Sequence, residues 1–311
     1  MTSTPRLIAL DWGTTNLHGY RLGDGGAVID HRDWPLGIMQ VADGNFAAAL
    51  ERALKPWQPL PPEIPILASG MIGSRQGWKE VPYAACPAGL DDVARALAPI
   101  EWAGRRVWLV PGASCSDRRG TPDVMRGEEA QIFGAASEAG SGDGLFVIPG
   151  THSKWVMVQR GRIARFATFM TGEMFAVLKG HSILGRMMQG AKIDAAAFRR
   201  GVGEAQATGG RLLHSLFGVR ALGLFGKLPE AEAAGYLSGL LIGAEFLEAP
   251  AVLGIEGQPP PLVLIGQADL ALHYGVAAGI LELPVRQAPP QAAAQGLWRL
   301  ANVASLVKQA A

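Results

Sequence analysis

The sequence predicts an α/β fold built from two related domains, each with a mixed sheet flanked by helices. The same pattern of an apolar run, a Gly-Thr turn and an alternating return strand occurs at residues 7–22 and again at residues 145–158. The second copy lies near the middle of the 311-residue chain, as expected for a duplicated fold. Strand-like and helix-like segments alternate after each hairpin, which is typical of α/β proteins.

The first half is expected to open with antiparallel strands and to continue as an α/β unit. Strands are predicted near residues 6–12, 17–23 and 27–34, followed by a helix over about 45–55 and a strand at Ile64–Leu67. The unit is completed by a helix over about 91–98, a strand at Val107–Val110 and a helix from Glu128 to about Ser137. The glycine-rich loop Glu138–Gly144 is the natural boundary, so the predicted domains are residues 1–143 and 144–311.

The second half repeats the opening of the first. The elements predicted are strands at about 145–149, 154–159 and 162–168, a helical region, a strand at Leu262–Ile265, a helix over about 267–279 and a final helix over about 290–308.

The longest apolar helix is predicted at about Ala231–Leu247. It carries glycines at four-residue spacing, a pattern that also occurs in membrane helix dimers. The stretch is too short for a bilayer and contains Glu232 and Glu245. We therefore expect a core helix that packs closely against a sheet or another helix through Gly235, Gly239 and Gly243.

Composition favours a cytoplasmic enzyme that acts on small soluble ligands. The chain has 49% hydrophobic and 18% charged residues, enough to bury two cores. Its net charge of +1 does not indicate binding to nucleic acid or to an anionic membrane. Only Cys86 and Cys115 are present, without metal-ligand spacing, and residues 1–6 lack the apolar stretch of a signal peptide. The oligomeric state is not readable, and a homodimer is left open.

The first turn, Asp11–Asn16, has the residue types that bind a phosphate. Gly13 allows the backbone to approach an anion, and the amides and hydroxyls of Thr14 and Thr15 can face it together with Asn16. Asp11 stands at the strand end, where Mg²⁺ with its water shell can dock. These residues indicate ATP chemistry, although an ordinary hairpin turn is the alternative.

The second turn, Pro149–Lys154, has the same character. Gly150 and Thr151 can hold a phosphate, and Lys154 can add positive charge unless it is a solvent-exposed strand lysine. Neither G-x-x-x-x-G-K-[ST] nor a G-x-G-x-x-G that opens a helix is present, so two common nucleotide-binding motifs are excluded.

These hairpins and a late strand-Gly-helix segment resemble the superfamily of acetate and sugar kinases, actin and chaperone ATPases. The resemblance implies two ribonuclease-H-like domains with the nucleotide in the cleft between them. More closely, six blocks in order resemble the 2-dehydro-3-deoxygalactonokinase family: Ala9–Leu17, Gly70–Ser74, Gly77–Lys79, Val124–Glu129, Pro149–Trp155 and Met170–Glu173. The family resemblance implies an ATP- and Mg²⁺-dependent phosphotransferase that phosphorylates the 6-hydroxyl of 2-dehydro-3-deoxy-D-galactonate in galactonate catabolism.

Phosphoryl transfer needs anion cradles, a metal anchor and one group aimed at the acceptor hydroxyl. We expect Asp11 to bind Mg²⁺ through water. The first turn is expected to bind the transferred phosphate, and the second turn the other phosphates. The segment from Arg126 to Gly134 resembles the Gly-Asp-Gln-Gln segment of glycerol and xylulose kinases, which places Glu128 at the position of their catalytic aspartate. The alternative is that Glu128 and Glu129 are first-turn acids that complement the helix dipole. The sequence leaves open which of the two is the base.

The acceptor that the family resemblance implies is a sugar acid, so its carboxylate is expected to need a cation or paired amides. Arg75 is the first candidate because it lies in the region where related sugar kinases bind their acceptor, and Trp78 can pack against the carbon chain. Arg126 is the second candidate, and either arginine can instead be a surface residue. Thr171 and Glu173 are polar residues in matched blocks and suit sugar hydroxyls.

Two assignments carry strong alternatives. Gly266 resembles the glycine of the superfamily's adenosine segment, although a helix start explains the same residues. His152 is expected to be a structural hydrogen-bonding residue, with a catalytic role as the alternative. The rival functions are a kinase for another acid, such as 2-dehydro-3-deoxygluconate, or a sensor that binds sugar and nucleotide without catalysis.

Overall fold

The computed structural model describes residues 4–137, 143–190, 192–266 and 268–307 and has the predicted α/β class, with mixed sheets flanked by helices. The chain divides into two compact units. Unit 1 contains Met1–Asp143, Val158–Arg165 and Gln291–Ala311, and unit 2 contains Gly144–Met157 and Phe166–Pro290. The last helix therefore belongs to unit 1, whereas the sequence assigned it to residues 144–311, and the domain division stays a prediction. Residues 138–142 of the predicted boundary loop lie outside the described residues.

The main sheet of unit 1 has the strand order β3-β2-β1-β4-β8-β7. Its strands are β1 (Leu7–Trp12), β2 (Leu17–Leu22), β3 (Val28–Trp34), β4 (Ile66–Gly70), β7 (Ala98–Trp102) and β8 (Arg105–Leu109). β1 pairs antiparallel with β2 and parallel with β4, and this register places Asp11 opposite His18 and beside Ser69. The end of β1 thus leads into the first turn and lies beside the start of β2 and the end of β4.

Two predictions for this sheet were wrong. The strand predicted at Ile64–Leu67 runs later, over Ile66–Gly70. The helix predicted over about 91–98 ends earlier, because α2 spans Leu90–Arg95 and β7 follows from Ala98. Pro99 accounts for this change, since a residue before proline favours extended backbone over helix.

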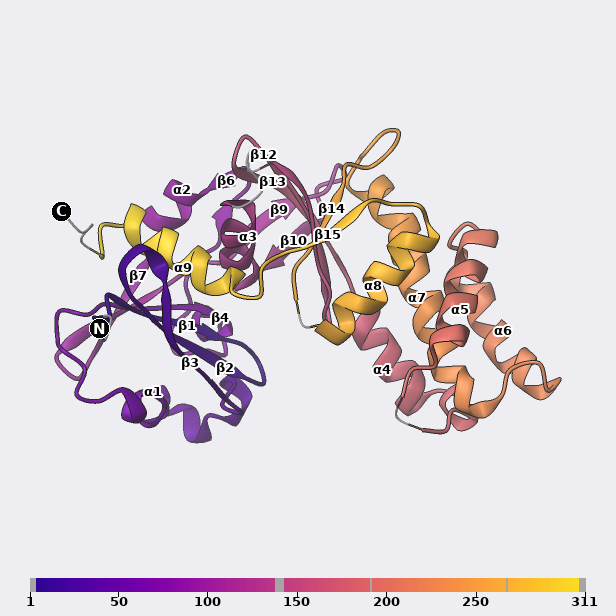
Figure 1. Ribbon diagram of the computed structural model, residues 1–311, viewed down its shortest axis with the longest axis horizontal. Helices are drawn as coiled ribbons and strands as arrows, with labels where there is room; N and C mark the ends of the chain where they lie inside the picture. The colour runs from indigo at the N-terminus through magenta and orange to yellow at the C-terminus, as the bar shows by residue number, and fades with distance from the viewer. Residues whose placement is uncertain (1–3, 138–142, 191, 267, 308–311) are drawn as a thin grey trace. The chain divides into compact units, whose positions relative to one another are not determined.

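The remaining elements of unit 1 include a small sheet of order β10-β9-β5. They are α1 (Phe46–Leu54), β5 (Ala84–Ala85), β6 (Ala88–Gly89), β9 (Ala113–Ser116), β10 (Pro122–Met125), α3 (Glu128–Ser137) and α9 (Ala292–Val303). α9 packs beside α3 (Figure 1). The contact needs Gly134 and Gly296, because a Cβ on either would lie within 1.9 Å of a carbonyl oxygen of the other helix.

Unit 2 is built around most of a six-stranded sheet of order β15-β14-β11-β12-β13-β6, in which β6 belongs to unit 1. Its strands are β11 (Gly144–Ile148), β12 (Ser153–Gln159), β13 (Arg162–Phe169), β14 (Leu262–Leu264) and β15 (Val285–Gln287), of which residues 158–165 belong to unit 1. Its helices are α4 (Thr171–His181), α5 (Ala195–Ala207), α6 (Leu212–Leu224), α7 (Glu230–Val252) and α8 (Ala268–Ile280). The two hairpins predicted from sequence are therefore β1–β2 and β11–β12.

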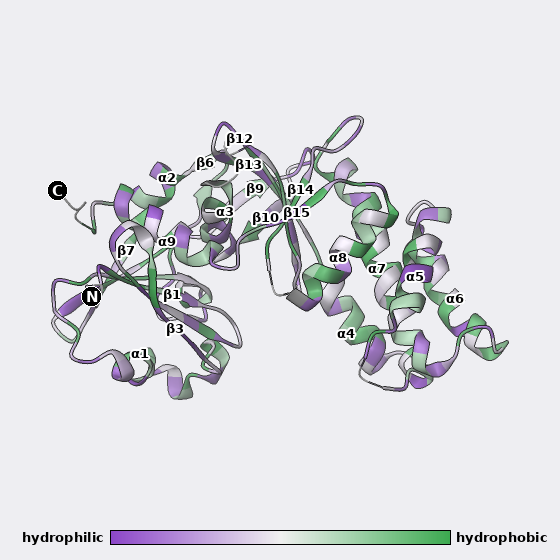
Figure 2. Cartoon of the chain, viewed as in Figure 1, coloured by the Kyte–Doolittle hydropathy of each residue, from purple (hydrophilic) through white to green (hydrophobic). Residues whose placement is uncertain are grey.

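The predicted close packing of the long apolar helix is confirmed. A Cβ on Gly235 would lie 2.6 Å from the carbonyl oxygen of Asp194, and one on Gly239 would lie 2.0 Å from that of Phe198. Both contacts are with α5 or the residue that caps it, so α7 packs on a helix. Hydrophobic residues run along much of α6 and α7 (Figure 2), but no helix in the described part of the chain is long and apolar enough to span a membrane.

Candidate active site

The first turn is supported through its carbonyl groups. Its own closing bond runs from the amide of Gly13 to the carbonyl oxygen of Asn16, at 2.9 Å. The carbonyls of Gly13, Thr14 and Thr15 then accept amide hydrogen bonds of 3.0, 3.3 and 2.9 Å. The donors belong to one loop: Ile38, Met39 and Gly37, in that order.

This arrangement leaves the donor side of the turn open. Thr14, Thr15 and Asn16 are exposed, and their amides donate no hydrogen bond within the described residues. Gly37 is required for the support, since a Cβ there would lie 2.2 Å from the carbonyl oxygen of Thr14. A turn with occupied carbonyls and open amides can present several N–H groups to one anion.

Asp11 lies beside this turn in a crowded backbone setting. Its Oδ2 accepts a hydrogen bond of 3.3 Å from the side-chain amide of Gln131 on α3. A Cβ on Gly70 would come within 3.2 Å of its Oδ1, and one on Gly127 within 3.7 Å, so two glycine backbones border the carboxylate. Burial raises the pKa of Asp11 from 3.8 to about 6, whereas His18 and Gln131 lower it. A cation beside this carboxylate would favour its ionised form and lower its pKa.

The start of α3 places two acids differently. Glu128 is half-buried, and its Oε2 accepts the amide of Arg126 at 2.9 Å. Glu129 is fully buried, and its Oε2 accepts the amide of Gly127 at 2.7 Å. Burial and the charge of Glu128 raise the pKa of Glu129 to about 8. Both acids therefore help to cap the helix, but only Glu128 combines solvent access with electrostatic influence on Asp11.

The two candidate arginines are in opposite environments. The Arg75 side chain is 85% exposed, and its Nε lies 3.5 Å from Oε1 of Glu80. Arg75 is therefore a surface residue. Arg126 is buried, lies 4.2 Å over the Tyr83 ring and donates from Nη2 to the carbonyl of Val81 at 2.8 Å. The surface alternative is therefore wrong for Arg126. Among the described residues its Nε and Nη1 have no hydrogen-bond partner.

Trp78 is three residues after Arg75, but it packs against the core of unit 1. Its ring stacks on Phe46 at a centroid distance of 6.3 Å, and its amide donates to the carbonyl of Ile72 at 2.9 Å. It remains partly exposed.

The second turn is supported by α4. The amide of Glu173 donates to the carbonyl of Thr151 at 2.9 Å. A Cβ on Gly172 would lie 2.4 Å from the carbonyl oxygen of Gly150, so only glycine allows the first turn of α4 this close. A Cβ on Gly150 itself would meet nothing nearer than 3.9 Å, which leaves open space at the turn.

The other predicted residues of unit 2 lie around this turn. His152 Nε2 and Glu173 Oε2 are 2.5 Å apart, so both side chains are paired with each other at the turn. The Thr171 hydroxyl hydrogen-bonds to the buried carboxylate of Glu245. Lys154 is 5% exposed, and the solvent-exposed alternative for this lysine is wrong.

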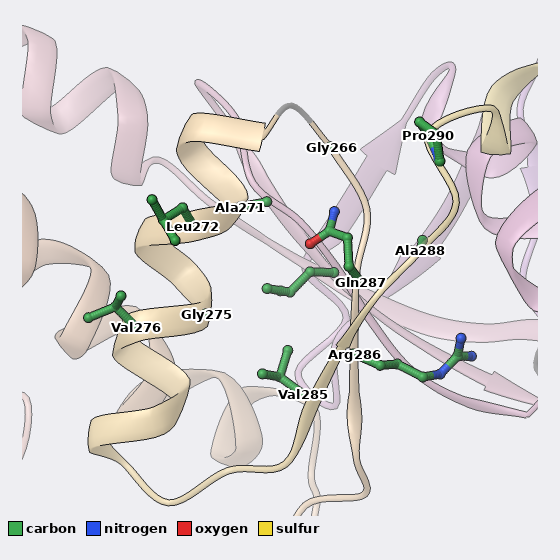
Figure 3. Close-up of a pocket in the computed structure, with 11 residues that line it drawn as sticks. Gly266, Ala271, Leu272, Gly275, Val276, Val285, Arg286, Gln287, Ala288 and Pro290 are labelled. Carbon is green, nitrogen blue, oxygen red and sulfur yellow. The ribbon is translucent and has the colours of Figure 1, made fainter.

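Gly266 lines a cavity of about 590 Å³ between α8 and β15 (Figure 3). Its φ of +146° favours glycine, and a Cβ would lie 3.8 Å from Pro149, which leads into the second turn. Val285 and Gln287 point toward α8, whereas Arg286 points away. The walls are mainly apolar: Leu264, Ala271, Leu272, Gly275, Val276, Val285, Ala288 and Pro290. A flat ring with a polar edge suits such a cavity. Gln267, which follows Gly266, lies outside the described residues.

The predicted residues thus fall into two groups. In unit 1, the first turn, Asp11 and the start of α3 form one cluster, while Arg75 stands apart on the surface. In unit 2, the second turn, the start of α4 and Gly266 form another.

Sequence reasoning missed three residues that hold these clusters together. Gln131 could have been found from its position, because it follows Glu128 by three residues and so lies on the same helical face. Gly172 lies within a block already matched to the family. Gly37 carries no comparable signal, because its contact with the first turn is long-range.

Comparisons with known proteins agree with these features. The 2-keto-3-deoxy-galactonokinase family profile matches residues 11–300. A Rhizobium meliloti (strain 1021) protein named "probable 2-dehydro-3-deoxygalactonokinase" is 37% identical over 96% of this chain and 100% of its own length. The 2-dehydro-3-deoxygalactonokinase of Escherichia coli (strain K12) is 37% identical over 78% of this chain and 80% of its own.

Solved structures extend the comparison to the fold. A crystal structure from Sinorhizobium meliloti with the same enzyme name matches with a TM-score of 0.85 and 36% identity, over 95% of this chain and 98% of that chain. A carbohydrate kinase from Novosphingobium aromaticivorans matches with a TM-score of 0.50 and 13% identity, over 95% and 93%, and this likeness shows the fold alone. The predicted sugar-kinase architecture is confirmed, and the chain belongs to the 2-keto-3-deoxy-galactonokinase family.

Proposed function

We propose that this chain transfers the γ-phosphoryl group of ATP to the 6-hydroxyl of 2-dehydro-3-deoxy-D-galactonate. Family membership supports the substrate class. The observation that carries the chemistry is the cluster in unit 1, where Asp11, Gln131 and Glu128 meet beside a turn with open amides. An acid, a half-buried base and free N–H donors in one place are what phosphoryl transfer requires.

The residues around Asp11 fit a hydrated magnesium ion. Hard oxygen ligands are what Mg²⁺ prefers, and the raised pKa of Asp11 reports a buried carboxylate short of positive charge. When bound, Mg²⁺ with ATP supplies charge neutralisation on the phosphate oxygens. The amides of Thr14, Thr15 and Asn16 bind the transferred phosphoryl group, and Gly150 and Thr151 bind the other phosphates. Lys154 adds positive charge in unit 2.

Glu128 acts as the base in this proposal. The 6-hydroxyl oxygen forms a bond to the γ-phosphorus as the bond from that phosphorus to the β–γ bridging oxygen breaks. The hydroxyl proton passes to the Glu128 carboxylate and ADP leaves.

Arg126 binds the carboxylate of the sugar acid. Two of its buried nitrogen atoms have no hydrogen-bond partner in the part of the chain that the structure describes, and a carboxylate is the ligand that a planar guanidinium fork matches best. Trp78 packs against the carbon chain, and Thr171 and Glu173 bind hydroxyl groups. Arg75, with its highly exposed side chain, has at most a secondary role.

The adenosine of ATP occupies the cavity beside Gly266. Its volume of about 590 Å³ lies within the range of small-molecule sites, and its apolar walls suit an aromatic base. The approach of Gly266 to Pro149 connects this cavity to the second turn. We further propose that the protein acts in the cytoplasm on small molecules alone; a homodimer stays a prediction.

A coupled ADP-release assay with Mg-ATP and purified sugar acids tests the proposal, with mass spectrometry of the product. We expect selective turnover of 2-dehydro-3-deoxygalactonate over its gluconate epimer. Preference for the gluconate epimer would replace the acceptor but keep the chemistry. Binding of nucleotide and sugar acid without any phosphorylated product would favour a sensor.

Glu128→Gln tests the assignment of the base. We expect kcat to fall about 10²–10⁴-fold, the usual contribution of a positioned general base. The dissociation constant of Mg-ADP should remain within twofold of the wild-type value. Glu101→Gln, at an exposed residue paired with Arg106, is the matched control. Near-normal turnover would remove Glu128 from this role.

A further inference from the structure

A buried acid in unit 2 has no part in the mechanism above. Glu245 lies on α7 and is 3% exposed. Its Oε2 accepts from the hydroxyls of Ser153 and Tyr274, at 3.0 and 2.8 Å, and its Oε1 accepts from the indole nitrogen of Trp155 at 2.7 Å. The Thr171 hydroxyl also bonds to it. Four donors from different parts of the chain thus meet at one carboxylate.

These donors come from the segments that carry the second phosphate turn. Ser153 is the first residue of β12, two residues after Thr151, and Trp155 is the third residue of that strand. Thr171 is the first residue of α4. Tyr274 lies on α8, one wall of the cavity beside Gly266, and its hydroxyl is also 2.9 Å from Ser153 Oγ. One carboxylate therefore joins the strand that leaves the turn to the helices beside the turn and the cavity.

Burial of an ionised carboxylate is energetically unfavourable at this position. Burial raises the pKa of Glu245, and the hydrogen bonds from its four partners oppose that shift. Apolar side chains of similar volume often stabilise a core as well as a buried polar network does. What such a network adds is a single defined arrangement of its members, because each unsatisfied donor is costly.

The second turn needs such an arrangement. Its contact with α4 depends on the bond from the Glu173 amide to the Thr151 carbonyl and on the approach of Gly172 to Gly150. A small shift of the turn against α4 would break that contact, since no side chain separates the two backbones.

We propose that Glu245 is a positioning residue that fixes the Gly150–Thr151 turn for binding the phosphates of ATP. The inference rests on the proposed function, in which this turn holds the nucleotide phosphates. Glu245 touches neither ATP nor sugar acid in this scheme and acts through Ser153, Trp155 and Thr171.

The test uses the full-length protein and three substitutions. Glu245→Gln keeps the shape but turns one acceptor into a donor that faces other donors, and Tyr274→Phe removes a single hydroxyl. Ser215→Ala is the matched control. Ser215 is also a buried hydroxyl of unit 2, but its side-chain partners among the described residues are Arg211 and Thr208. Thermal unfolding midpoints identify any variant that fails to fold.

The decisive readout is the dissociation constant of Mg-ADP, measured by calorimetry. We expect an increase of about tenfold in Glu245→Gln and about threefold in Tyr274→Phe, the size expected for a lost or mispaired hydrogen bond. Ser215→Ala should leave the constant within twofold even if its unfolding midpoint falls. Unchanged ADP affinity in both network variants would overturn the inference.

A double-mutant cycle separates positioning from general destabilisation. If Glu245 acts through the turn, Glu245→Gln combined with Thr151→Ala should weaken ADP binding less than the product of the two single effects. Independent effects that multiply would contradict the proposal. Turnover by the wild-type protein tests the proposed function separately, so either proposal can fail alone.

Discussion

The two Gly-Thr turns that we propose to bind phosphate share a sequence pattern but differ in what supports them. In unit 1, three carbonyls of the turn accept amides from one loop, and side-chain chemistry is concentrated at Asp11 beside it. In unit 2, a single amide of α4 reaches the turn, and a buried carboxylate joins the surrounding elements. Similar turns can therefore be held by backbone alone or by a side-chain network, and the pattern of the turn does not reveal which.

The buried acids of the two units differ in the same way. Glu129 in unit 1 accepts one neighbouring amide through Oε2, while its Oε1 has no partner among the described residues. Glu245 in unit 2 has four side-chain donors. The buried acid of unit 1 is thus only partly hydrogen-bonded among the described residues, whereas the buried acid of unit 2 is held by four donors.

The largest expected effect comes from Asp11→Asn, which removes the proposed metal anchor of unit 1. We expect kcat to fall on the order of 10³-fold, as for the loss of a main electrostatic group. The unfolding midpoint should be unchanged or higher, because burial already disfavours the ionised form of Asp11. The coupled assay and thermal unfolding measure both quantities. Asp24→Asn, at an exposed residue paired with Arg6, is the control. A variant that retains a fifth of the activity would place the metal elsewhere.

The next effect separates the two arginines of unit 1. Arg126→Lys should lower kcat/KM for the sugar acid about 10- to 100-fold, because lysine cannot reproduce the planar fork. Arg75→Lys should change it less than twofold, since that side chain is exposed and paired with the exposed Glu80. Steady-state kinetics with varied acceptor decide between them. The reverse order of effects would restore Arg75 as the carboxylate ligand.

Alanine at the two supporting glycines compares the turns directly. Gly37→Ala places a Cβ 2.2 Å from Thr14 in unit 1, and Gly172→Ala places one 2.4 Å from Gly150 in unit 2. We expect Gly37→Ala to act mainly on kcat and Gly172→Ala to raise the KM for ATP about tenfold, each with a loss of about 1–3 kcal/mol in stability. Varied-ATP kinetics with thermal unfolding provide the measurement.

Gly180→Ala is the control for the α4 substitution. A Cβ at Gly180 meets nothing within 4 Å, so alanine should leave kinetics unchanged and stabilise the helix by roughly 0.5–1 kcal/mol. Equal kinetic effects of Gly180→Ala and Gly172→Ala would show that the approach of α4 to the turn is unimportant.

The last effect concerns stability alone and is a pH dependence in unit 1. The pKa of Glu129 rises from 4.5 to about 8, so the folded protein keeps a proton that the unfolded chain releases. This stabilisation is complete below the unfolded pKa and is lost as the pH rises through the folded value. Relative to Glu129→Gln, the wild-type midpoint should fall by roughly 2–4 °C per pH unit across that window. Parallel curves for the two proteins would show that Glu129 is ionised when folded.

Much of the fold was predictable because its signals are local. Both hairpins, α3 and the late strand leading to Gly266 follow from apolar periodicity and turn residues within short windows. The close packing of α7 followed from glycine spacing along a single helix. β7 was missed because the helical pattern before it obscured the effect of Pro99.

The sequence by itself determined the chemistry-bearing residue types and the family, because these depend on short motifs in a fixed order. Only the tertiary structure decided which of those residues have the environment their roles need. It distinguished buried Arg126 from exposed Arg75, and Glu128 from Glu129, since burial depends on elements distant in the chain. It also brought Gly37, Gln131 and Glu245 to the turns and Asp11, because long-range packing sets such contacts and local pattern does not.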